Sequence, residues 1–266
     1  MSTTEAGSNF PPGAAWRATA TLAHRELVRF FRQRNRVFGA LGQPLIFWGL
    51  FSLGLQSRQL GFAHFFPGTL AMILLFTAIF ATISIIEDRR EGFLQSVLVA
   101  PAPRWAMVLG KVLGGAAIAL LQALLFLVLG WFALSMTSGP AEIVLAVILM
   151  AVIAVALTGL GFAIAWRMDS THGFHAVMSV FLLPMWLLSG SFFPPGSGPL
   201  EWVVRANPLT YGVAGLRRYL TFADEAAATV AGPSAALCWI VSLGFAGAML
   251  VAAWRAAGTR TTGDLL

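Results

Sequence analysis

Six long apolar stretches without a single Asp or Glu constrain this 266-residue chain more than any motif does. A bilayer core about 30 Å thick needs roughly 20 apolar residues for one helical crossing. Each stretch is close to that length, so the sequence predicts an all-α integral membrane protein with six transmembrane helices. The predicted spans cover residues 37–55, 69–86, 108–134, 143–166, 175–192 and 235–254. A mean hydropathy of +0.80 and a charged content of only 11% exclude a soluble domain.

The scarcity of charged side chains inside these spans indicates how any transport by this protein is driven. Lys111 and His175, both near span edges, are the only basic side chains in them. Ionisable residues within membrane spans usually mark ion pathways and proton relays. Their near absence argues against an ATP-independent channel or secondary carrier. It predicts that any transport draws its energy from outside the spans.

The distribution of Lys and Arg predicts the orientation in the membrane. If the N-terminus is cytoplasmic, 13 of the 17 basic residues lie in inner segments. The inner set is Arg17, Arg25, Arg29, Arg32, Arg34, Arg36, Arg89, Arg90, Arg104, Lys111, Arg167, Arg255 and Arg260, and the outer set is Arg58, Arg205, Arg217 and Arg218. The positive-inside rule therefore predicts a multi-pass protein of the cell inner (cytoplasmic) membrane with both termini cytoplasmic. This asymmetry explains the net charge of +6 without nucleic-acid binding.

The residues before the first span divide into two parts. Residues 1–15 lack the apolar core of a signal peptide and predict a disordered tail. Residues 16–36 predict an amphipathic helix along the inner membrane surface, which is either an anchor only or also a contact for a cytoplasmic partner. Its apolar positions are Trp16, Ala20, Ala23, Leu27, Phe30 and Phe31, and its candidate interface residues are Arg25, Glu26, Arg29 and Arg32. Residues 37–266 are expected to form one transmembrane domain.

The connection between the second and third spans carries the sharpest local signal. A charge block at residues 87–91 ends the second span, and a short apolar helical face follows. This face consists of Phe93, Leu94, Val97 and Leu98, and Pro101 and Pro103 end it. A short apolar helix in the cytoplasm has no lipid to cover it. We therefore expect it to lie in a groove of a partner protein.

The external segment 194–233 is too long for a simple loop. Residues 200–205 and 209–220 predict two short helices separated by Asn207 and Pro208, since proline is well tolerated at a helix start. Trp202 and Tyr211 make these helices apolar enough to dip into the outer leaflet. They are expected to be re-entrant or, alternatively, to form a simple outer lid.

No catalytic or metal-binding constellation is present in the sequence. Cys238 is the single cysteine, and no G-x-x-x-x-G-K-[ST] nucleotide-binding loop occurs. Ser189 with His172 and His175 does not fit an intramembrane serine protease, because the required glycine before the serine is missing and the histidines precede it. The glycine pairs in residues 114–115 and 159–161 favour close helix packing.

Two sequence blocks resemble the membrane subunits of type-2 ABC transporters, which are usually exporters. The first runs through Asp88-Arg89-Arg90-Glu91-Gly92 to Val99-Ala100-Pro101 and continues with Arg104 and Gly110-Lys111. The second contains Ser189-Gly190-Ser191-Phe192-Phe193-Pro194, Pro199-Leu200-Glu201-Trp202 and Asn207-Pro208-Leu209-Thr210-Tyr211. Both blocks stand in the family's order, and the resemblance covers nearly all of the chain after Trp16. The Asp that often follows the Tyr in this family is absent, since Gly212, Val213 and Ala214 follow Tyr211.

The resemblance implies a division of labour between subunits. It implies a homodimer of this permease with two separate ABC ATPase subunits, which bind ATP and Mg, while this chain binds no cofactor. A coupling helix at residues 91–100 would dock on the ATPase, and re-entrant helices would cap the exit. The implied coupling residues are Glu91, Gly92, Phe93, Leu94, Val97, Leu98 and Pro101, and the implied exit residues are Trp202, Asn207, Pro208 and Tyr211.

We therefore expect the transmembrane subunit of an ATP-driven exporter, itself not an enzyme. Aromatic and Met side chains without fixed charge suit a hydrophobic or amphipathic substrate such as a drug, lipid or glycolipid. The candidate pathway residues are Phe47, Trp48, Phe51, Phe76, Phe80, Met185 and Trp186, although each equally fits a packing or lipid-facing role. The alternative is an assembly of the same architecture that transmits a mechanical signal or rearranges lipids.

Overall fold

The computed structural model describes residues 12–54, 61–99, 103–191, 199–223 and 232–258, and these ranges are all-helical without a β-strand. The helices are α1 (Pro12–Arg32), α2 (Arg34–Gly54), α3 (Phe62–Ala81), α4 (Ile83–Arg90), α5 (Phe93–Val99), α6 (Arg104–Ala133), α7 (Pro140–Ala165), α8 (Thr171–Trp186), η2 (Leu187–Ser191), α9 (Pro199–Ala206), α10 (Pro208–Tyr219) and α11 (Ala235–Gly258). The predicted all-α fold is confirmed.

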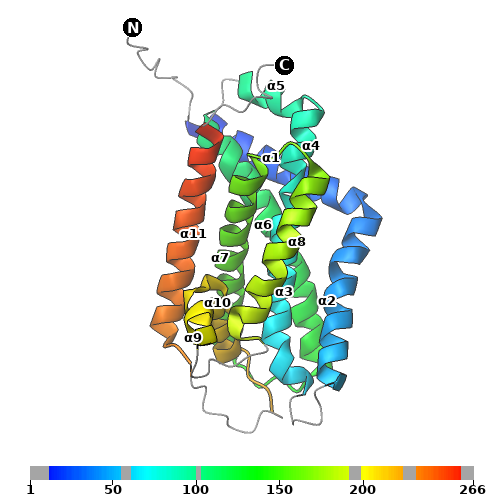
Figure 1. Ribbon diagram of the computed structural model, residues 1–266, viewed down its shortest axis with the longest axis vertical. Helices are drawn as coiled ribbons and strands as arrows, with labels where there is room; N and C mark the ends of the chain where they lie inside the picture. Colours follow the sequence, from blue (N-terminus) through cyan, green and yellow to red (C-terminus); the bar gives the residue numbers. More distant parts are fainter. Residues whose placement is uncertain (1–11, 55–60, 100–102, 192–198, 224–231, 259–266) are drawn as a thin grey trace.

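The long helices run side by side along one axis, and short helices close the two ends (Figure 1). We call the end that carries α1, α4 and α5 the charged end, and the end that carries α9 and α10 the opposite end. Within the described ranges, five helices are long and apolar enough to cross a membrane. These spans are Phe62–Arg90, Arg104–Ala133, Pro140–Ala165, Thr171–Ser191 and Ala235–Gly258. The predicted first span corresponds to α2, which packs beside α3 at the edge of the bundle.

Helix α3 forms the centre of the bundle. It contacts α2, α6, α7, α8 and α10, and its side chains from Leu70 to Leu75 are all buried. A helix that is apolar on all sides is typical of such a central position. By contrast, α8 and α11 bury only a minority of their residues and present apolar side chains such as Phe181 and Ile240 to the exterior. The exposed apolar faces are those expected against lipid.

Glycines in α6 and α7 allow neighbouring helices to approach closely. A Cβ on Gly115 would stand 2.7 Å from Thr158, and one on Gly161 would stand 2.8 Å from Thr82. Gly159 packs against the backbone of Met249 in α11 in the same way. The prediction that these glycines serve helix packing is confirmed.

The segment before the bundle differs from its predicted boundaries. Helix α1 already begins at Pro12, because proline suits the first turn of a helix and Ala15 packs against the protein. It ends at Arg32, and after a break at Gln33 the chain turns into α2. The predicted helix 16–36 is therefore wrong at both ends, and residues 12–15 of the predicted tail are helical, whereas residues 1–11 lie outside the described ranges. Helix α1 lies across the charged end of the bundle (Figure 1).

The first and last helices meet the same end of the molecule. Helix α11 ends near the start of α6, where Arg104 donates a hydrogen bond to the carbonyl of Gly258 at 3.3 Å. Helix α1 also packs on the start of α6, and Thr19 donates to the carbonyl of Ala106 at 3.2 Å. Helix α1 and the end of α11 therefore lie at the charged end of the bundle.

Gly114→Ala is expected to lower the melting temperature of the detergent-solubilised protein. A Cβ at Gly114 would stand 2.8 Å from the Cβ of Glu26 and 3.2 Å from the Cα of Ala23, so α1 would be pushed off α6. Gly247→Ala is the matched control, because no atom lies within 4 Å of a Cβ there. That change should stabilise α11 by about 0.5–1 kcal/mol. Equal melting temperatures for the two variants in a thermal unfolding assay would contradict the close packing of α1.

Candidate functional site

A buried group of charges joins three helices at the charged end. Its centre is Asp88 in the last turn of α4, whose side chain is 0% exposed. Arg25 of α1 donates to both carboxylate oxygens, from Nη2 to Oδ1 at 2.9 Å and from Nη1 to Oδ2 at 3.1 Å. Arg29 donates to Oδ1 at 2.8 Å, and Lys111 of α6 donates to Oδ2. One carboxylate therefore binds three cations from two other helices.

The remaining carboxylates complete what we call the Asp88 cluster. Glu26 of α1 accepts a 2.6 Å hydrogen bond from Lys111, and both side chains are buried. Glu87 and Glu91, on the more exposed side, accept from Arg29 at 2.9 and 3.4 Å. The cluster consists of Arg25, Glu26, Arg29, Glu87, Asp88, Glu91 and Lys111, which makes four carboxylates and three cations. Each buried carboxylate of the cluster, Glu26 and Asp88, thus has cationic partners within hydrogen-bond distance, as a buried ion pair requires.

The ionisation of Arg25 follows from its surroundings. Burial alone would lower the pKa of its guanidinium, but the hydrogen bond and attraction to Asp88 raise this pKa above its ordinary value. Arg25 therefore stays charged throughout the physiological pH range. The last carbonyls of α4 also carry partial negative charge, which favours cations at this helix end.

A sharp turn places the short helix α5 against this cluster. Gly92, at φ 75°, adopts the left-handed conformation that glycine accepts most readily, and it reverses the chain between α4 and α5. The guanidinium of Arg25 lies 3.7 Å from the ring centroid of Phe93 in a cation–π contact. Leu94 is buried, whereas Val99 is 85% exposed. The cluster thus holds the inner face of α5, and the outer face projects beyond the bundle (Figure 1).

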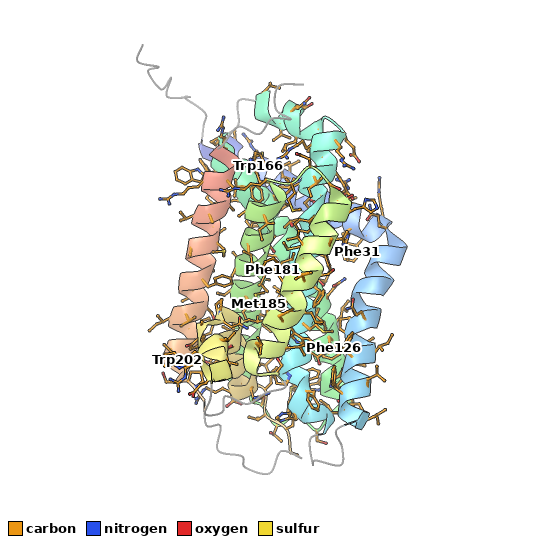
Figure 2. All side chains as sticks on the ribbon, in the orientation of Figure 1. Phe31, Phe126, Trp166, Phe181, Met185 and Trp202 are labelled. Atoms are coloured by element: carbon orange, nitrogen blue, oxygen red, sulfur yellow. The ribbon has the colours of Figure 1, made fainter. Side chains whose placement is uncertain are left out.

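The other side of α4 is attached to the connection between α7 and α8. Arg89 donates to the carbonyl of Trp166 at 2.6 Å and to the carboxylate of Asp169 at 3.2 Å. Arg90 donates to the carbonyl of Asp169 at 3.1 Å. Figure 2 shows Trp166 at this end of the molecule. Helix α4 is therefore held on two sides, by α1 and α6 and by the α7–α8 connection.

The predicted coupling and interface residues come together at this site with three corrections. The helix in the segment predicted for coupling spans Phe93–Val99 rather than residues 91–100, because the turn at Gly92 precedes it. Leu94, predicted on the contact face, is instead buried against its own chain. Arg32, predicted with Arg25 and Arg29, is exposed outside the cluster. Two further predicted coupling residues cannot be placed in the same way. Pro101 lies outside the described residues, and so does the side chain of Leu98.

Sequence reasoning missed the two residues that organise the site. The sequence places Asp88 and Lys111 in one block of the family resemblance, but it does not predict that their side chains form an ion pair. Their signals were present, because Lys111 is the single lysine of the chain. A lone lysine in an apolar span needs a carboxylate partner.

Five of the seven predicted pathway residues pack against neighbouring helices, and two of these are also held by hydrogen bonds. The indole of Trp48 donates to the carbonyl of Phe62 at 3.0 Å, and the indole of Trp186 donates to the carbonyl of Gly68 at 2.7 Å. Both tryptophans are buried. The rings of Phe47 and Phe51 pack on Trp186 with centroid distances of 5.9 and 6.3 Å. These aromatics fasten α2 and α8 to α3. Met185 also packs against the core.

The other two pathway residues, Phe76 and Phe80, line a cavity of about 350 Å³ between α2, α3 and α8. Its wall is mostly apolar, with a few polar groups that include Thr77 and His175. The ring of His175 lies 4.8 Å from that of Phe80. Size and lining are those of a pocket for a small apolar or amphipathic molecule.

The predicted exit residues lie at the opposite end. Asn207 caps α10 by accepting from the backbone N–H of Leu209 at 3.0 Å, and its amide donates to the carbonyl of Met185 at 2.6 Å. Pro208 opens α10, as predicted. Tyr211 donates to the carbonyl of Arg205 at 3.1 Å. Trp202 of α9 is 76% exposed, and Figure 2 shows it near the end of the bundle. Helix α10 is mostly buried against α7 and α11.

These features define a multi-pass helical membrane protein with a charged end that holds a projecting helix. Residues 17–220 match the family model described as ABC-2 type transporter. The chain therefore belongs to this family, which confirms the resemblance seen in the sequence.

Curated relatives agree with this assignment. Over 151 residues the chain is 26% identical to the probable multidrug ABC transporter permease YbhR of Escherichia coli strain K12, and equally to the protein of that name in Escherichia coli O157:H7. The match covers 54% of this chain and 40% of each relative. The matched part thus spans about two fifths of the relatives' length.

Asp88→Asn is expected to destabilise the protein far more than Glu87→Gln. The first change keeps the shape but leaves Arg25, Arg29 and Lys111 without their shared anion, and breaking a buried ion pair costs about 3–5 kcal/mol. The second removes one carboxylate from a partly exposed pair and should cost less than about 1 kcal/mol. Chemical unfolding in detergent measures both. Similar losses for the two variants would contradict the central role of Asp88.

Proposed function

We propose that the chain is the transmembrane subunit of an ATP-driven exporter and that a separate ABC ATPase, carrying ATP and Mg, hydrolyses the nucleotide. Family membership supports a permease role, and the relatives named as multidrug permeases support a transport function. The observation that carries the proposal is the attachment of α5 to the Asp88 cluster.

The geometry of α5 suits the transmission of force from an ATPase. Its outer face offers Gln95, Ser96 and Val99 to a partner, while Phe93 and Leu94 are held by the permease itself. Since α4 continues α3 almost directly, a push on α5 reaches the centre of the bundle. A binding surface on a flexible loop would absorb such a push.

The assembly and its orientation follow from the same elements. We place the charged end in the cytoplasm of a cell with the protein in its inner membrane, because most arginines of the chain lie at or near that end. Helix α2 then serves as a sixth crossing. Two copies of the chain pair in the membrane, with one ATPase beneath each. Helices α9 and α10 lie at the outer face, where they cap the exit.

The cavity beside Phe76 and Phe80 supports a hydrophobic or amphipathic substrate, such as a drug or lipid. The described residues that line the cavity include no Asp, Glu, Lys or Arg, and His175 is their one titratable side chain. Aromatic and Met side chains adapt to varied apolar shapes. Binding there would be governed by shape and burial rather than by ion pairing.

Val99→Asp is expected to weaken binding of the ATPase subunit by roughly 100-fold, because an unpaired carboxylate at a contact costs about 3 kcal/mol. The fold should survive, since Val99 is exposed. Ser135→Asp adds the same charge to an exposed loop at the opposite end and is the control. Co-purification of the ATPase with both variants at wild-type yield would refute α5 as the docking element.

Transport by vesicles that contain the permease and its ATPase should continue when proton and sodium gradients are collapsed. It should stop when ATP is withheld, because no carboxylate lies in the middle of the described spans to carry an ion. A fluorescent amphipathic dye reports the movement. Dye movement that follows a protonophore and ignores ATP would refute the proposal. ATP hydrolysis without movement of any of a panel of dyes and lipids would favour a mechanical role.

A further inference from the structure

A second hollow lies on the outside of the bundle, between α7 and α11. These helices touch at Gly159 and Met249, and a groove of about 590 Å³ lies next to this contact, nearer the charged end. Ala163 and Ile164 of α7 and Ala248 and Ala252 of α11 line the groove and form an apolar floor.

Two exposed arginines line this groove. Arg167 and Arg255 both line it, both are exposed, and neither forms an ion pair within the described part of the chain. Asp169, the acidic residue nearest to Arg167 in sequence, is engaged by Arg89 and Arg90 instead. The groove therefore combines apolar walls with two arginines that have no carboxylate partner among the described residues.

The arginines lie at a level where lipid headgroups are expected. Trp254, next to Arg255, is 56% exposed, and Trp105 and Trp16 of the same end are also exposed and in edge-to-face contact. Tryptophans are enriched at the membrane–water interface. Exposed tryptophans here therefore mark the headgroup region of the adjacent leaflet.

We propose that the groove between α7 and α11 binds one anionic phospholipid of this leaflet. The phosphate binds Arg167 and Arg255, and an acyl chain lies on the alanines of the groove. A lipid is favoured over a soluble phosphate compound because the apolar floor would stay uncovered beneath a headgroup alone. The site is independent of which substrate is transported, and it does not require the ATPase.

The test uses the full-length, delipidated protein in detergent, titrated with phosphatidylglycerol or phosphatidylcholine and followed by native mass spectrometry. One phosphatidylglycerol should bind more tightly than the others and more tightly than phosphatidylcholine. The double variant Arg167→Gln, Arg255→Gln should weaken phosphatidylglycerol binding roughly 30-fold. Each arginine near an anionic headgroup contributes a factor of about five to the affinity, and the two factors multiply. The control pair Arg17→Gln with Arg32→Gln removes the same charge from exposed positions of α1 at the same end and should leave the affinity unchanged.

Two further arms separate a lipid from a headgroup alone. Ala248→Phe fills the groove from an exposed position and should weaken phosphatidylglycerol binding with both arginines in place. Soluble glycerol phosphate should not displace the lipid. The proposal is overturned if the Arg167 and Arg255 variant binds as wild type does, if the α1 control loses as much affinity, if Ala248→Phe has no effect, or if glycerol phosphate competes. Size-exclusion chromatography verifies the fold of each variant.

Discussion

The burial of one carboxylate, Asp88, organises the charged end of this protein. A fully buried anion is costly unless its oxygens are paired, and here two arginines of α1 and one lysine of α6 pair them. The helices that supply these cations are far from Asp88 in sequence. Their relative placement, and with it the placement of α5, depends on that carboxylate. Glycines in α6 make the arrangement possible, because α1 must come close for its side chains to reach.

The distribution of polarity along the bundle has a simple physical logic. Most ion pairs of the described residues lie at the charged end, the Glu201–Arg205 pair of α9 lies at the opposite end, and the middle of α3 is packed with apolar side chains. The indoles of Trp48 and Trp186, which are buried in the bundle, donate to backbone carbonyls in the first two turns of α3. These two bonds tie α2 and α8 to α3. The interior therefore combines low polarity with fixed helix positions.

Sequence alone predicted the helices well and the contacts between them poorly. Apolar runs of membrane-spanning length identify helices such as α6 and α7, because the bilayer imposes their composition. The start of α10 at Pro208 was also predictable from local chemistry. The partners of Lys111 were not, since Glu26 is 85 residues away and only the packing of α1 brings it near. The burial of Leu94 likewise depends on the turn at Gly92, which decides the face that α5 turns inward.

The near continuity of α3 and α4 gives the molecule a lever. Phe62–Arg90 forms a single span of 29 residues, interrupted only by the turn at Thr82. At 1.5 Å per residue it is about 43 Å long, so a tilt of about 5° around its far end displaces the α4 end by about 4 Å. Displacements of that size at α5 therefore correspond to small rotations deep in the bundle. A displacement of α5 would therefore reach the centre of the bundle as a small tilt of α3.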